Sequence, residues 1–348
     1  MTAPLDLSHY RLLGRSGLRV SPMCLGTMTF GAQGFGTAED EARKIFDAYV
    51  ERGGNFFDTA NYYSNGRSEE LLGQFIGERR HEMVIATKYS LSAPGDANVS
   101  GNHRKSMMRG IEGSLRRLGT DYIDLFYLHV WDGMTPVEEI MRGLDDAVSQ
   151  GKIVYAGISD TPAWQVSRMQ MLADLRGWAP LVALQIPYSL IERTVERELI
   201  PMATELGLGV LPWSPLASGI LSGKYAGQPE TIDSARATAL AQRGHLTDRA
   251  YAVATALADV AGQAGVTSAQ AALAWVLNNP AVTSPIIGAR TPDQFADNLG
   301  ALGVVLDPAH RQALDDVSAV AFGFPHEFLN QDFIQLGLSA GNSIRPRR

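Results

Sequence analysis

Four side chains that could act together on a proton lie at the ends of short apolar runs. Asp58 and Tyr63 follow the apolar start of residues 55–57, Lys88 ends the run VIATK, and His129 ends the run DLFYLH. A phenol has an ordinary pKa of about 10, so it donates a proton at neutral pH only if the phenolate left behind is stabilised. A nearby ammonium stabilises a phenolate, because it favours the charged form of its neighbour. The set therefore indicates proton transfer to a carbonyl oxygen, with Tyr63 as the donor.

The other two side chains have roles that complete this chemistry. An Asp58 carboxylate paired with Lys88 would keep the ammonium charged and in place while partly buried. A His129 imidazole within hydrogen-bond reach would orient a carbonyl oxygen next to the phenol. Taken singly, each residue also has an ordinary structural interpretation, such as a turn cap, a solvated strand end, a core histidine or a loop-packing tyrosine. The hypothesis depends on their occurrence together on consecutive strands.

Short apolar runs alternate along the chain with segments whose apolar residues recur at helical spacing. The predicted strands are residues 23–27, 55–59, 83–88, 123–129, 153–158, 182–186, 209–213 and 285–287. The predicted helices start near 38, 136, 162 and 292 or span 68–80, 104–118, 194–206, 247–264 and 268–278. Between 214 and about 247 the chain departs from this rhythm.

Eight strand-helix repeats without a linker rich in Pro, Gly or charge favour an α/β fold of the single (β/α)8 TIM-barrel type over two doubly wound domains. We expect one domain over residues 1–348, with the barrel core at about 23–305. In such a barrel the chemistry lies at the carboxyl ends of the strands. Asp58, Tyr63, Lys88 and His129 are therefore expected at one mouth.

Two pieces lie outside the repeats. Residues 10–23 place a glycine-containing turn between short apolar stretches, which predicts an N-terminal β-hairpin that closes the bottom of the barrel. Residues 306–348 form a C-terminal extension, with a helix at 308–319 and a tail from 325. This tail either drapes over the barrel or stays partly disordered.

Composition limits the class of partner. The net charge is −7 and the basic residues are scattered, which argues against a nucleic-acid surface. The single cysteine, Cys24, excludes an intramolecular disulfide framework and fits a reducing compartment. No apolar run resembles an export signal or a membrane span. We therefore expect a cytoplasmic protein with a small-molecule partner, no nucleic acid and no membrane, whose oligomeric state the sequence does not indicate.

Several well-known site motifs are missing from the sequence. No GxGxxG follows a predicted strand, and GILSGKY lacks the spacing of a P-loop. The absence of HExxH and of a cysteine pair argues against a catalytic zinc, so no metal is expected. A dinucleotide, if one binds, must be held by the loops of the barrel.

The motifs resemble, in order, those of the aldo-keto reductase superfamily, from MCLGTMTFG at residue 23 to NLGAL at residue 298. FFDTANYYSNGRSEELLG resembles the segment of the catalytic aspartate and tyrosine, VIATK the lysine strand and DYIDLFYLH the histidine strand. GISD, QIPYS, PWSPLASGILSGKY and IIGARTPDQFADNL resemble the cofactor-binding segments. GISDTPAW and TANYYSNG are most similar to the aryl-alcohol dehydrogenase-like subgroup.

The resemblance implies that Asp58, Tyr63, Lys88 and His129 form a catalytic tetrad, with Tyr63 as general acid in reduction and general base in the reverse reaction. The implied cofactor is NADPH or NADP+, with NADH left open. The implied cofactor contacts are Gly26, Thr27, Asp58, Ser159, Asp160, Gln185, Trp213, Ser214, Pro215, Leu216, Ser218, Lys224, Gly288, Arg290, Gln294 and Asn298.

Within this set, Ser159, Asp160 and Gln185 would hold the carboxamide and Trp213 would lie against the nicotinamide ring. Residues 214–224 would follow the pyrophosphate and residues 288–298 the adenosine end. Asp160 stands where many members carry Asn, which removes two amide donors. Trp213 replaces a common Tyr and keeps an aromatic face.

The implied contacts of residues 288–298 with the adenosine end also have a physical basis in the sequence. Thr291 and Pro292 open a predicted helix whose N-terminal amides attract phosphate, and Arg290 just before it can pair with a 2′-phosphate. An ordinary surface cation is the alternative interpretation of Arg290. Asp293 in the same turn would repel a phosphate pointing toward it.

The predicted function is NADP(H)-dependent reduction of aldehydes or ketones. The aromatic side chains Phe30, Tyr62, Tyr89 and Trp131 are the candidate walls of a substrate pocket, which favours an aromatic or apolar carbonyl or alcohol. One alternative is an NADPH-binding regulatory or redox-sensing subunit with little turnover. Another makes Lys88 the Schiff-base nucleophile of an aldolase, which requires a depressed lysine pKa that Asp58 would oppose.

Overall fold

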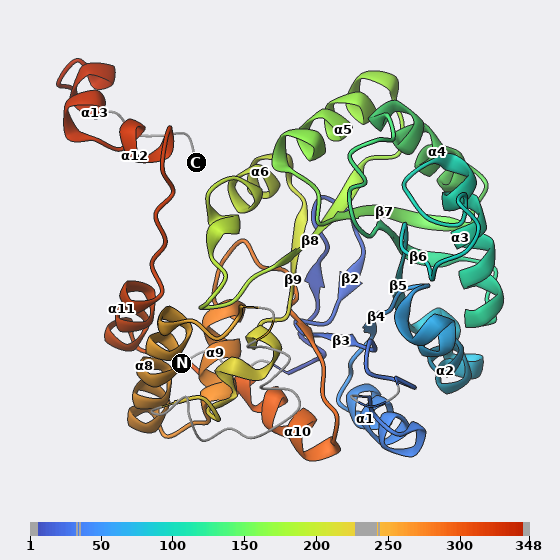
Figure 1. Cartoon of the computed structure of the whole chain (residues 1–348), viewed down its shortest axis with the longest axis horizontal. Helices are drawn as coiled ribbons and strands as arrows, with labels where there is room; N and C mark the ends of the chain where they lie inside the picture. Colours follow the sequence, from blue (N-terminus) through green and yellow to red (C-terminus); the bar gives the residue numbers. More distant parts are fainter. Residues whose placement is uncertain (1–5, 33, 35, 227–241, 243, 344–348) are drawn as a thin grey trace.

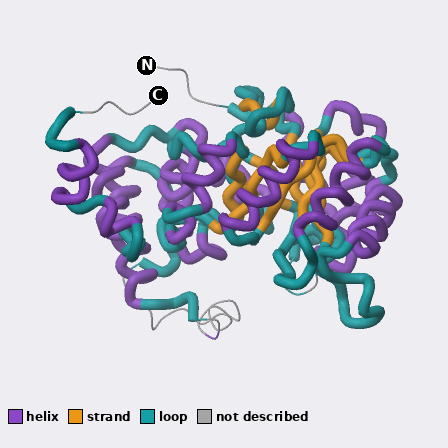
Figure 2. The backbone as a smooth tube through the Cα atoms, turned by 90° about the horizontal axis from the view of Figure 1, so that it is seen from above, coloured by secondary structure: helices purple, strands orange, loops and turns teal. Residues whose placement is uncertain are grey.

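The computed structural model describes residues 6–32, 34, 36–226, 242 and 244–343. Figure 1 shows helices arranged around a central group of strands. Figure 2, a view from above, shows the same strands with helices on both sides. The strands are β3 (Cys24–Gly26), β4 (Phe56–Asp58), β5 (Val84–Tyr89), β6 (Ile123–Leu128), β7 (Ile153–Ser159), β8 (Leu181–Pro187), β9 (Gly209–Trp213) and β10 (Ile286–Ile287).

These eight strands form one sheet in the order β10-β3-β4-β5-β6-β7-β8-β9. Every neighbouring pair is parallel. The two ends of the sheet meet, because Val210 of β9 forms a parallel bridge with Val282 just before β10. The predicted (β/α)8 barrel is confirmed.

The helices of the barrel are α1 (Glu39–Glu51), α2 (Arg67–Ile76), α3 (Arg104–Leu118), α4 (Val137–Ser149), α5 (Ala163–Arg176), α6 (Leu199–Leu206), α8 (Asp248–Ala264), α9 (Ser268–Leu277) and α10 (Pro292–Gly300). The helix predicted at 68–80 ends earlier as an α-helix, because Gly77 has φ +51° and the chain continues as the 3-10 turn η2 (Gly77–Glu82). The helix predicted at 194–206 is divided into η3 (Thr194–Glu196) and α6. Pro201 explains the late start of α6, because proline is tolerated only in the first turn of a helix.

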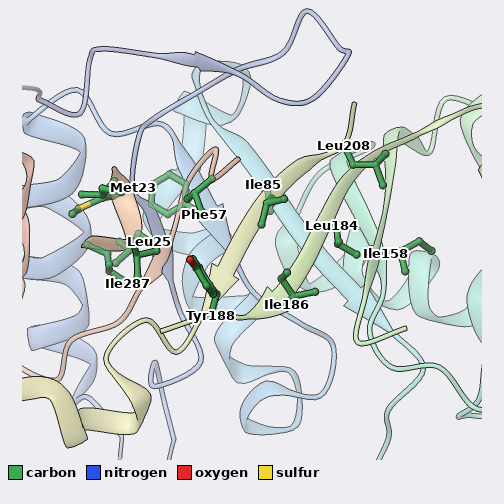
Figure 3. Packing of buried hydrophobic residues seen from close by; sticks show 14 of the residues in the cluster. Met23, Leu25, Phe57, Ile85, Ile158, Leu184, Ile186, Tyr188, Leu208 and Ile287 are labelled. Atoms are coloured by element: carbon green, nitrogen blue, oxygen red, sulfur yellow. The ribbon is translucent and has the colours of Figure 1, made fainter. Parts of the chain in front are cut away.

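Side chains along the strands alternate between two cores. Val84 and Ala86 of β5 pack inside the barrel, whereas Ile85 packs outward against the helices. Figure 3 shows part of this outer core, in which Ile85 of β5 and Leu184 and Ile186 of β8 are labelled. Because side chains on a strand alternate with a period of two, Lys88 continues the inward series.

The N-terminal hairpin forms as predicted, from β1 (Arg11–Leu12) and β2 (Arg19–Val20) in antiparallel pairing. Its turn residue Gly14 has φ +55° and lies so close to the starts of β8 and β9 that a Cβ atom would come within 2.3 Å of the Val182 carbonyl oxygen. Leu13 is fully buried and belongs to the inner core. The hairpin therefore covers the amino-terminal end of the barrel, and Cys24 is buried in the core above it.

The C-terminal extension contains α11 (Pro308–Val317), α12 (His326–Leu329) and α13 (Asp332–Ser339). Helix α11 packs on α8, whereas α12 and α13 stand apart from the barrel in Figure 1. The described part of the tail does not drape over the barrel, and it contacts the region beside α6 through His326 Nε2, which lies 2.9 Å from Glu198 Oε1. Residues 344–348, and residues 227–241 and 243 of the predicted irregular segment, lie outside the described residues. In the part of the chain that the structure describes, no helix has the length and apolar character needed to cross a bilayer.

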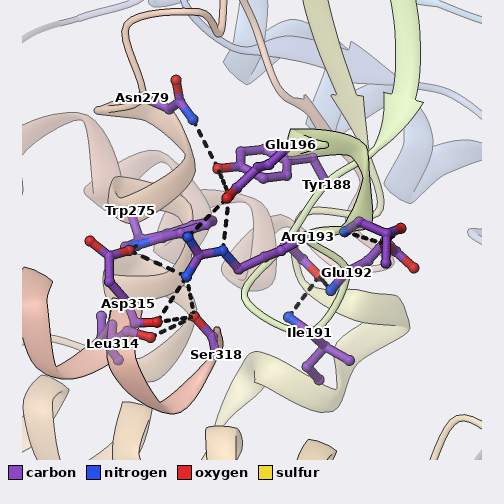
Figure 4. Close-up of polar contacts among 12 residues, drawn as sticks. Tyr188, Ile191, Glu192, Arg193, Glu196, Trp275, Asn279, Leu314, Asp315 and Ser318 are labelled. Atoms are coloured by element: carbon purple, nitrogen blue, oxygen red, sulfur yellow. Dashed lines mark hydrogen bonds and ion pairs between the residues drawn. The ribbon is translucent and has the colours of Figure 1, made fainter. Parts of the chain in front are cut away.

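Arg193 joins the loop after β8 to α11 through a set of polar contacts (Figure 4). Its Nε atom lies 2.9 Å from Glu196 Oε1, and its Nη1 atom donates to the Asp315 carbonyl oxygen at 3.0 Å and to Ser318 Oγ at 2.8 Å. The guanidinium also lies 5.1 Å from the centre of the Trp275 ring. Only 14% of the Arg193 side chain is exposed, so these contacts are shielded from water.

We expect Arg193→Ala to lower the free energy of unfolding by about 2–4 kcal/mol. The change removes the shielded guanidinium from the Glu196 carboxylate, the Asp315 carbonyl oxygen and the Ser318 hydroxyl. Urea denaturation would measure this loss. Arg79→Ala is the matched control, because Arg79 forms a half-exposed pair with Glu82, and such pairs contribute at most about 1 kcal/mol. Equal losses in the two variants would contradict the expectation.

Candidate active site

Three consecutive strands bring the predicted proton-transfer residues to the carboxyl end of the barrel. Asp58 is the last residue of β4, Lys88 lies near the end of β5, and His129 follows β6 directly. Tyr63 begins η1 (Tyr63–Gly66), a short 3-10 turn between β4 and α2. The parallel register pairs Asp58 with Ala86, so Lys88 lies one inward position farther along than Asp58. The structure therefore brings all four side chains to the same mouth.

A buried ion pair is the centre of this group. Lys88 is fully buried, and its Nζ atom donates to Asp58 Oδ1 at 2.5 Å and to the Thr59 carbonyl oxygen at 2.7 Å. Its third contact is the Tyr63 hydroxyl oxygen at 3.4 Å. Asp58 Oδ2 accepts from Gln185 Nε2 at 2.7 Å. The ammonium thus connects the carboxylate to the phenol, and the phenolic hydrogen remains available to another acceptor.

The charges of this group follow from burial and from its close partners. Burial is the largest single effect and acts to lower the pKa of Lys88, but the Asp58 carboxylate and Tyr63 together exceed it, so the pKa of Lys88 is raised. Burial raises the pKa of Tyr63 despite the opposing effect of Lys88. The sequence-based argument considered only the lowering by Lys88, and desolvation outweighs it. Lys88 is therefore a charged ammonium and Tyr63 a neutral phenol, which disfavours a Schiff-base role for Lys88.

His129 stands edge-on to Tyr63, with ring centres 5.8 Å apart and ring planes at 81°. Burial, and after it the Lys88 ammonium, lowers the pKa of His129 to about 3. Its Nδ1 atom is buried and has no hydrogen-bond partner within the described part of the chain. His129 is therefore a neutral imidazole that can make a hydrogen bond at the mouth without changing its charge.

We expect the imidazole signals of His129 to show no titration between pH 5 and pH 8, because the pKa of about 3 lies below this range. Proton–carbon correlation NMR of a histidine-labelled sample would measure this, with the signal assigned through its loss in His129→Gln. A midpoint near the ordinary histidine value of about 6.5 would contradict the expected neutrality.

The residues predicted to hold a nicotinamide carboxamide lie at or near the ends of β7 and β8, and Trp213, predicted to lie against the ring, ends β9. Ser159 pairs in register with Gln185, and the Ser159 hydroxyl is buried without a hydrogen-bond partner among the residues that the structure describes. Asp160 has φ +39°, and its Oδ1 atom accepts from the indole Nε1 of Trp213 at 3.1 Å. An unpartnered buried hydroxyl beside an amide and a half-buried indole fits a planar polar ligand at this edge of the mouth.

The predicted pyrophosphate residues follow β9 in a tightly turned segment. Ser214, Ala217 and Ser218 have φ values of +50°, +47° and +59°, and the 3-10 turn η4 (Ala217–Ser222) begins there. Such alternation of backbone conformation can direct successive amides toward an anion. Of the remaining predicted contacts here, Pro215 is buried, Leu216 is half-buried and Lys224 is exposed.

The predicted adenosine residues gather around the start of α10. Arg290 and Gly288 are exposed, and the Arg290 amide donates to Gln294 Oε1 at 3.1 Å. Asn298 Nδ2 lies 3.4 Å from the Gly288 carbonyl oxygen, and Thr291 caps the helix through the Gln294 amide. The four predicted residues thus lie together, with the Arg290 side chain at the surface.

Gly26 ends β3, Thr27 follows it, and both make contacts inside the protein. A Cβ atom on Gly26 would lie 2.7 Å from Ile286 Cγ2, so close packing of β3 on β10 requires glycine here. The Thr27 hydroxyl is fully buried and donates to the Asp58 carbonyl oxygen at 3.1 Å. Both residues therefore support the strand that carries Asp58.

The four aromatic residues predicted to line a substrate pocket fall into two groups. Tyr62 is 46% exposed and Trp131 is half-buried, so both offer surface near the mouth. Tyr89 is a core residue, because it follows Lys88 on the outward side of β5 and stacks on Phe126. Phe30 is likewise buried, with its ring 6.1 Å from that of Phe75. The burial of Tyr89 and Phe30 does not favour the predicted role as pocket walls, which stays a prediction.

Sequence reasoning did not find two contacts of the site. The Thr59 carbonyl oxygen holds Lys88 as closely as a carboxylate does, and only its place directly after Asp58 hinted at this. The pairing of Asp160 with Trp213 joins residues on β7 and β9. No spacing in the sequence indicates such a contact.

Comparison with known proteins agrees with this geometry. The model of the Aldo/keto reductase family matches residues 22–319. The chain belongs to the aldo/keto reductase family. This assignment confirms the predicted superfamily and makes the chain an oxidoreductase.

Individual relatives of this aldo/keto reductase cover nearly the whole chain. An uncharacterized oxidoreductase, YrpG, of Bacillus subtilis is 40% identical over 89% of this chain and 95% of its own length. An aryl-alcohol dehydrogenase [NADP(+)] of Phanerodontia chrysosporium is 37% identical over 93% of this chain and 89% of its own length. A norsolorinic acid reductase of Aspergillus flavus is 36% identical over 94% of this chain and 85% of its own length. The predicted similarity to aryl-alcohol dehydrogenases is confirmed for this aldo/keto reductase.

Proposed function

We propose that the chain reduces aldehydes or ketones to alcohols with NADPH, and that Tyr63 supplies the proton. The observation that carries this proposal is the buried contact series from Asp58 through Lys88 to the Tyr63 hydroxyl. Because Lys88 donates to the phenol oxygen, the phenol keeps its own hydrogen for a substrate oxygen. The arrangement suits a general acid better than a nucleophile.

The residues at the mouth fit a nicotinamide dinucleotide. The unpartnered hydroxyl of Ser159 and the indole of Trp213 suit a carboxamide-bearing aromatic ring. The turned segment from Ser214 to Ser218 suits a pyrophosphate. When bound, the reduced cofactor supplies a hydride to the carbonyl carbon.

The protein residues then act on the carbonyl oxygen. Tyr63 donates its hydroxyl proton to this oxygen, and the Lys88 ammonium stabilises the phenolate that remains. Asp58 holds Lys88 in place, with its second oxygen held by Gln185. The neutral His129 imidazole orients the carbonyl oxygen from the side of Tyr63. In alcohol oxidation the same phenolate takes the proton back.

A preference for the 2′-phosphorylated cofactor rests on Arg290 and the start of α10. Arg290 is exposed, has no ion pair with any residue that the structure describes, and precedes a capped helix N-terminus, where amides favour a phosphate. The name of the Phanerodontia relative includes NADP(+), which supports the same choice. Asp293 in the first turn of α10 opposes it.

The substrate class that we propose is an aromatic carbonyl compound. Tyr62 and Trp131 leave aromatic surface near the mouth, and such surfaces favour flat apolar ligands. The names aryl-alcohol dehydrogenase and norsolorinic acid reductase, carried by two relatives, support this class.

A spectrophotometric screen tests the proposal. The purified chain is mixed with NADPH or with NADH and with panels of aromatic aldehydes, aromatic ketones and aliphatic aldehydes. We expect NADPH-dependent turnover of aromatic aldehydes at about 1 s−1 or faster. Tight NADPH binding with negligible turnover over all panels would instead favour a regulatory or redox-sensing subunit. Equal turnover with NADH would overturn the cofactor preference alone.

A further inference from the structure

Asp160 is held firmly at the end of β7 by contacts on two sides. Its backbone carbonyl accepts from the Trp131 amide at 3.3 Å, and its carboxylate accepts from the Trp213 indole at 3.1 Å. Its φ of +39° lies in the left-handed region, which Asp and Asn tolerate better than most residues. The carboxylate is therefore fixed beside the face of the mouth that Trp213 forms.

The charges around Asp160 leave this side of the mouth negative. Lys88 is the ammonium that faces both Asp160 and Asp58, and its two shortest contacts are with Asp58 and the Thr59 carbonyl. His129 is neutral because its pKa lies at about 3. Two carboxylates thus share one ammonium that is already committed to the other carboxylate. Burial raises the pKa of Asp160, and the Trp213 indole and then Lys88 act against this rise, so Lys88 balances the Asp160 carboxylate only in part.

We propose that Asp160 makes the site bind the oxidised nicotinamide dinucleotide more tightly than the reduced one. This inference rests on the proposed function, because it takes the nicotinamide ring to lie against Trp213. The oxidised ring carries one positive charge that the reduced ring lacks, whereas the ribose, phosphate and adenine groups are the same in both. A fixed carboxylate beside the ring discriminates between the two forms by charge, and a carboxamide of the same shape does not.

The consequence for the reaction follows from its balance. In carbonyl reduction a hydride passes from the reduced ring to the carbonyl carbon, and the Tyr63 proton passes to the carbonyl oxygen. The carbonyl compound is reduced and the ring is left oxidised and positively charged. Because Asp160 stabilises this positive charge, it favours the reductive direction on the protein. Asp160 would then determine which charge state of the cofactor binds more tightly, and it would also hold Trp213 through their hydrogen bond.

The test compares dissociation constants for NADP+ and NADPH by isothermal titration calorimetry at pH 8, without a carbonyl substrate. We expect Asp160→Asn to lower the ratio of the NADPH constant to the NADP+ constant about tenfold. This variant keeps the shape of the side chain and an oxygen that can accept the Trp213 indole hydrogen. Asp160→Gly is a second charge-free variant, and glycine adopts a positive φ without strain. We expect the same fall in the ratio.

Asp124→Asn is the matched control for the removal of a shielded carboxylate. Asp124 pairs with Arg80 near the start of β6, at the opposite end of the barrel, and its side chain is 13% exposed. Its removal should leave the ratio unchanged. A role of Asp160 restricted to holding Trp213 or the carboxamide would change both constants by the same factor. A ratio within twofold of the unmodified protein in both Asp160 variants therefore overturns the inference.

The same measurements separate this inference from the proposed function. If the unmodified chain binds neither dinucleotide, the proposed function fails and the Asp160 inference fails with it. If the unmodified chain binds both and reduces aldehydes, but the ratio does not change in the variants, only the Asp160 inference fails.

Discussion

Replacing Tyr63 with Phe should lower kcat for aldehyde reduction by about 10²- to 10⁴-fold, which is the usual contribution of a positioned general acid. The ring of Tyr63 is edge-on to His129 and lies 4.9 Å from Lys88 Nζ, and Phe keeps this ring. Only the hydroxyl that Lys88 contacts at 3.4 Å is lost. The change therefore removes the proton donor without opening the site.

Two measurements show whether the loss in Tyr63→Phe is chemical. The dissociation constant for NADPH should stay within about threefold of the unmodified value, because no cofactor contact is assigned to the hydroxyl. Tyr62→Phe is the matched control on the neighbouring residue, whose ring is 46% exposed, and it should retain most of the turnover. Retained turnover in Tyr63→Phe, or equal losses in the two variants, would exclude Tyr63 as the donor.

The barrel and the mouth could be predicted because both depend on local periodicity. The apolar pattern of β5 is set by alternation, which also directs Lys88 inward, and adjacent parallel strands place Asp58 beside it. The same alternation directs Tyr89 outward, where it stacks on Phe126, and this orientation could also have been predicted from the sequence. Alternation within a strand is thus reliable information about which side chains reach a barrel interior.

Contacts across the barrel could not be predicted in this way. Gln185 reaches Asp58 over a separation of 127 residues, and no spacing in the sequence reports that approach. The pKa of Tyr63 also depends on how completely packing shields the phenol from water. This burial raises the pKa by more than the Lys88 ammonium lowers it. The contact of His326 in the tail with Glu198 likewise joins residues 128 positions apart, and no spacing in the sequence indicates it. These features are set by tertiary packing.

Replacing Lys88 with Met should lower the free energy of unfolding by about 3–5 kcal/mol, because it leaves the Asp58 carboxylate buried without its charge partner. Asp58 Oδ2 would keep its hydrogen bond from Gln185, but Oδ1 would lose the ammonium at 2.5 Å. Turnover should fall as well, because Lys88 opposes the rise in the pKa of Tyr63 that burial produces.

Stability and activity should separate in the double variant Asp58→Asn with Lys88→Met. Removing both charges removes the uncompensated carboxylate, so urea denaturation should recover at least half of the stability lost in Lys88→Met. The kcat should stay at the level of Lys88→Met, because no cation remains to stabilise the Tyr63 phenolate. If the double variant regained turnover together with stability, the ammonium would serve the fold alone, and the proton-transfer role of the buried pair would have to be abandoned.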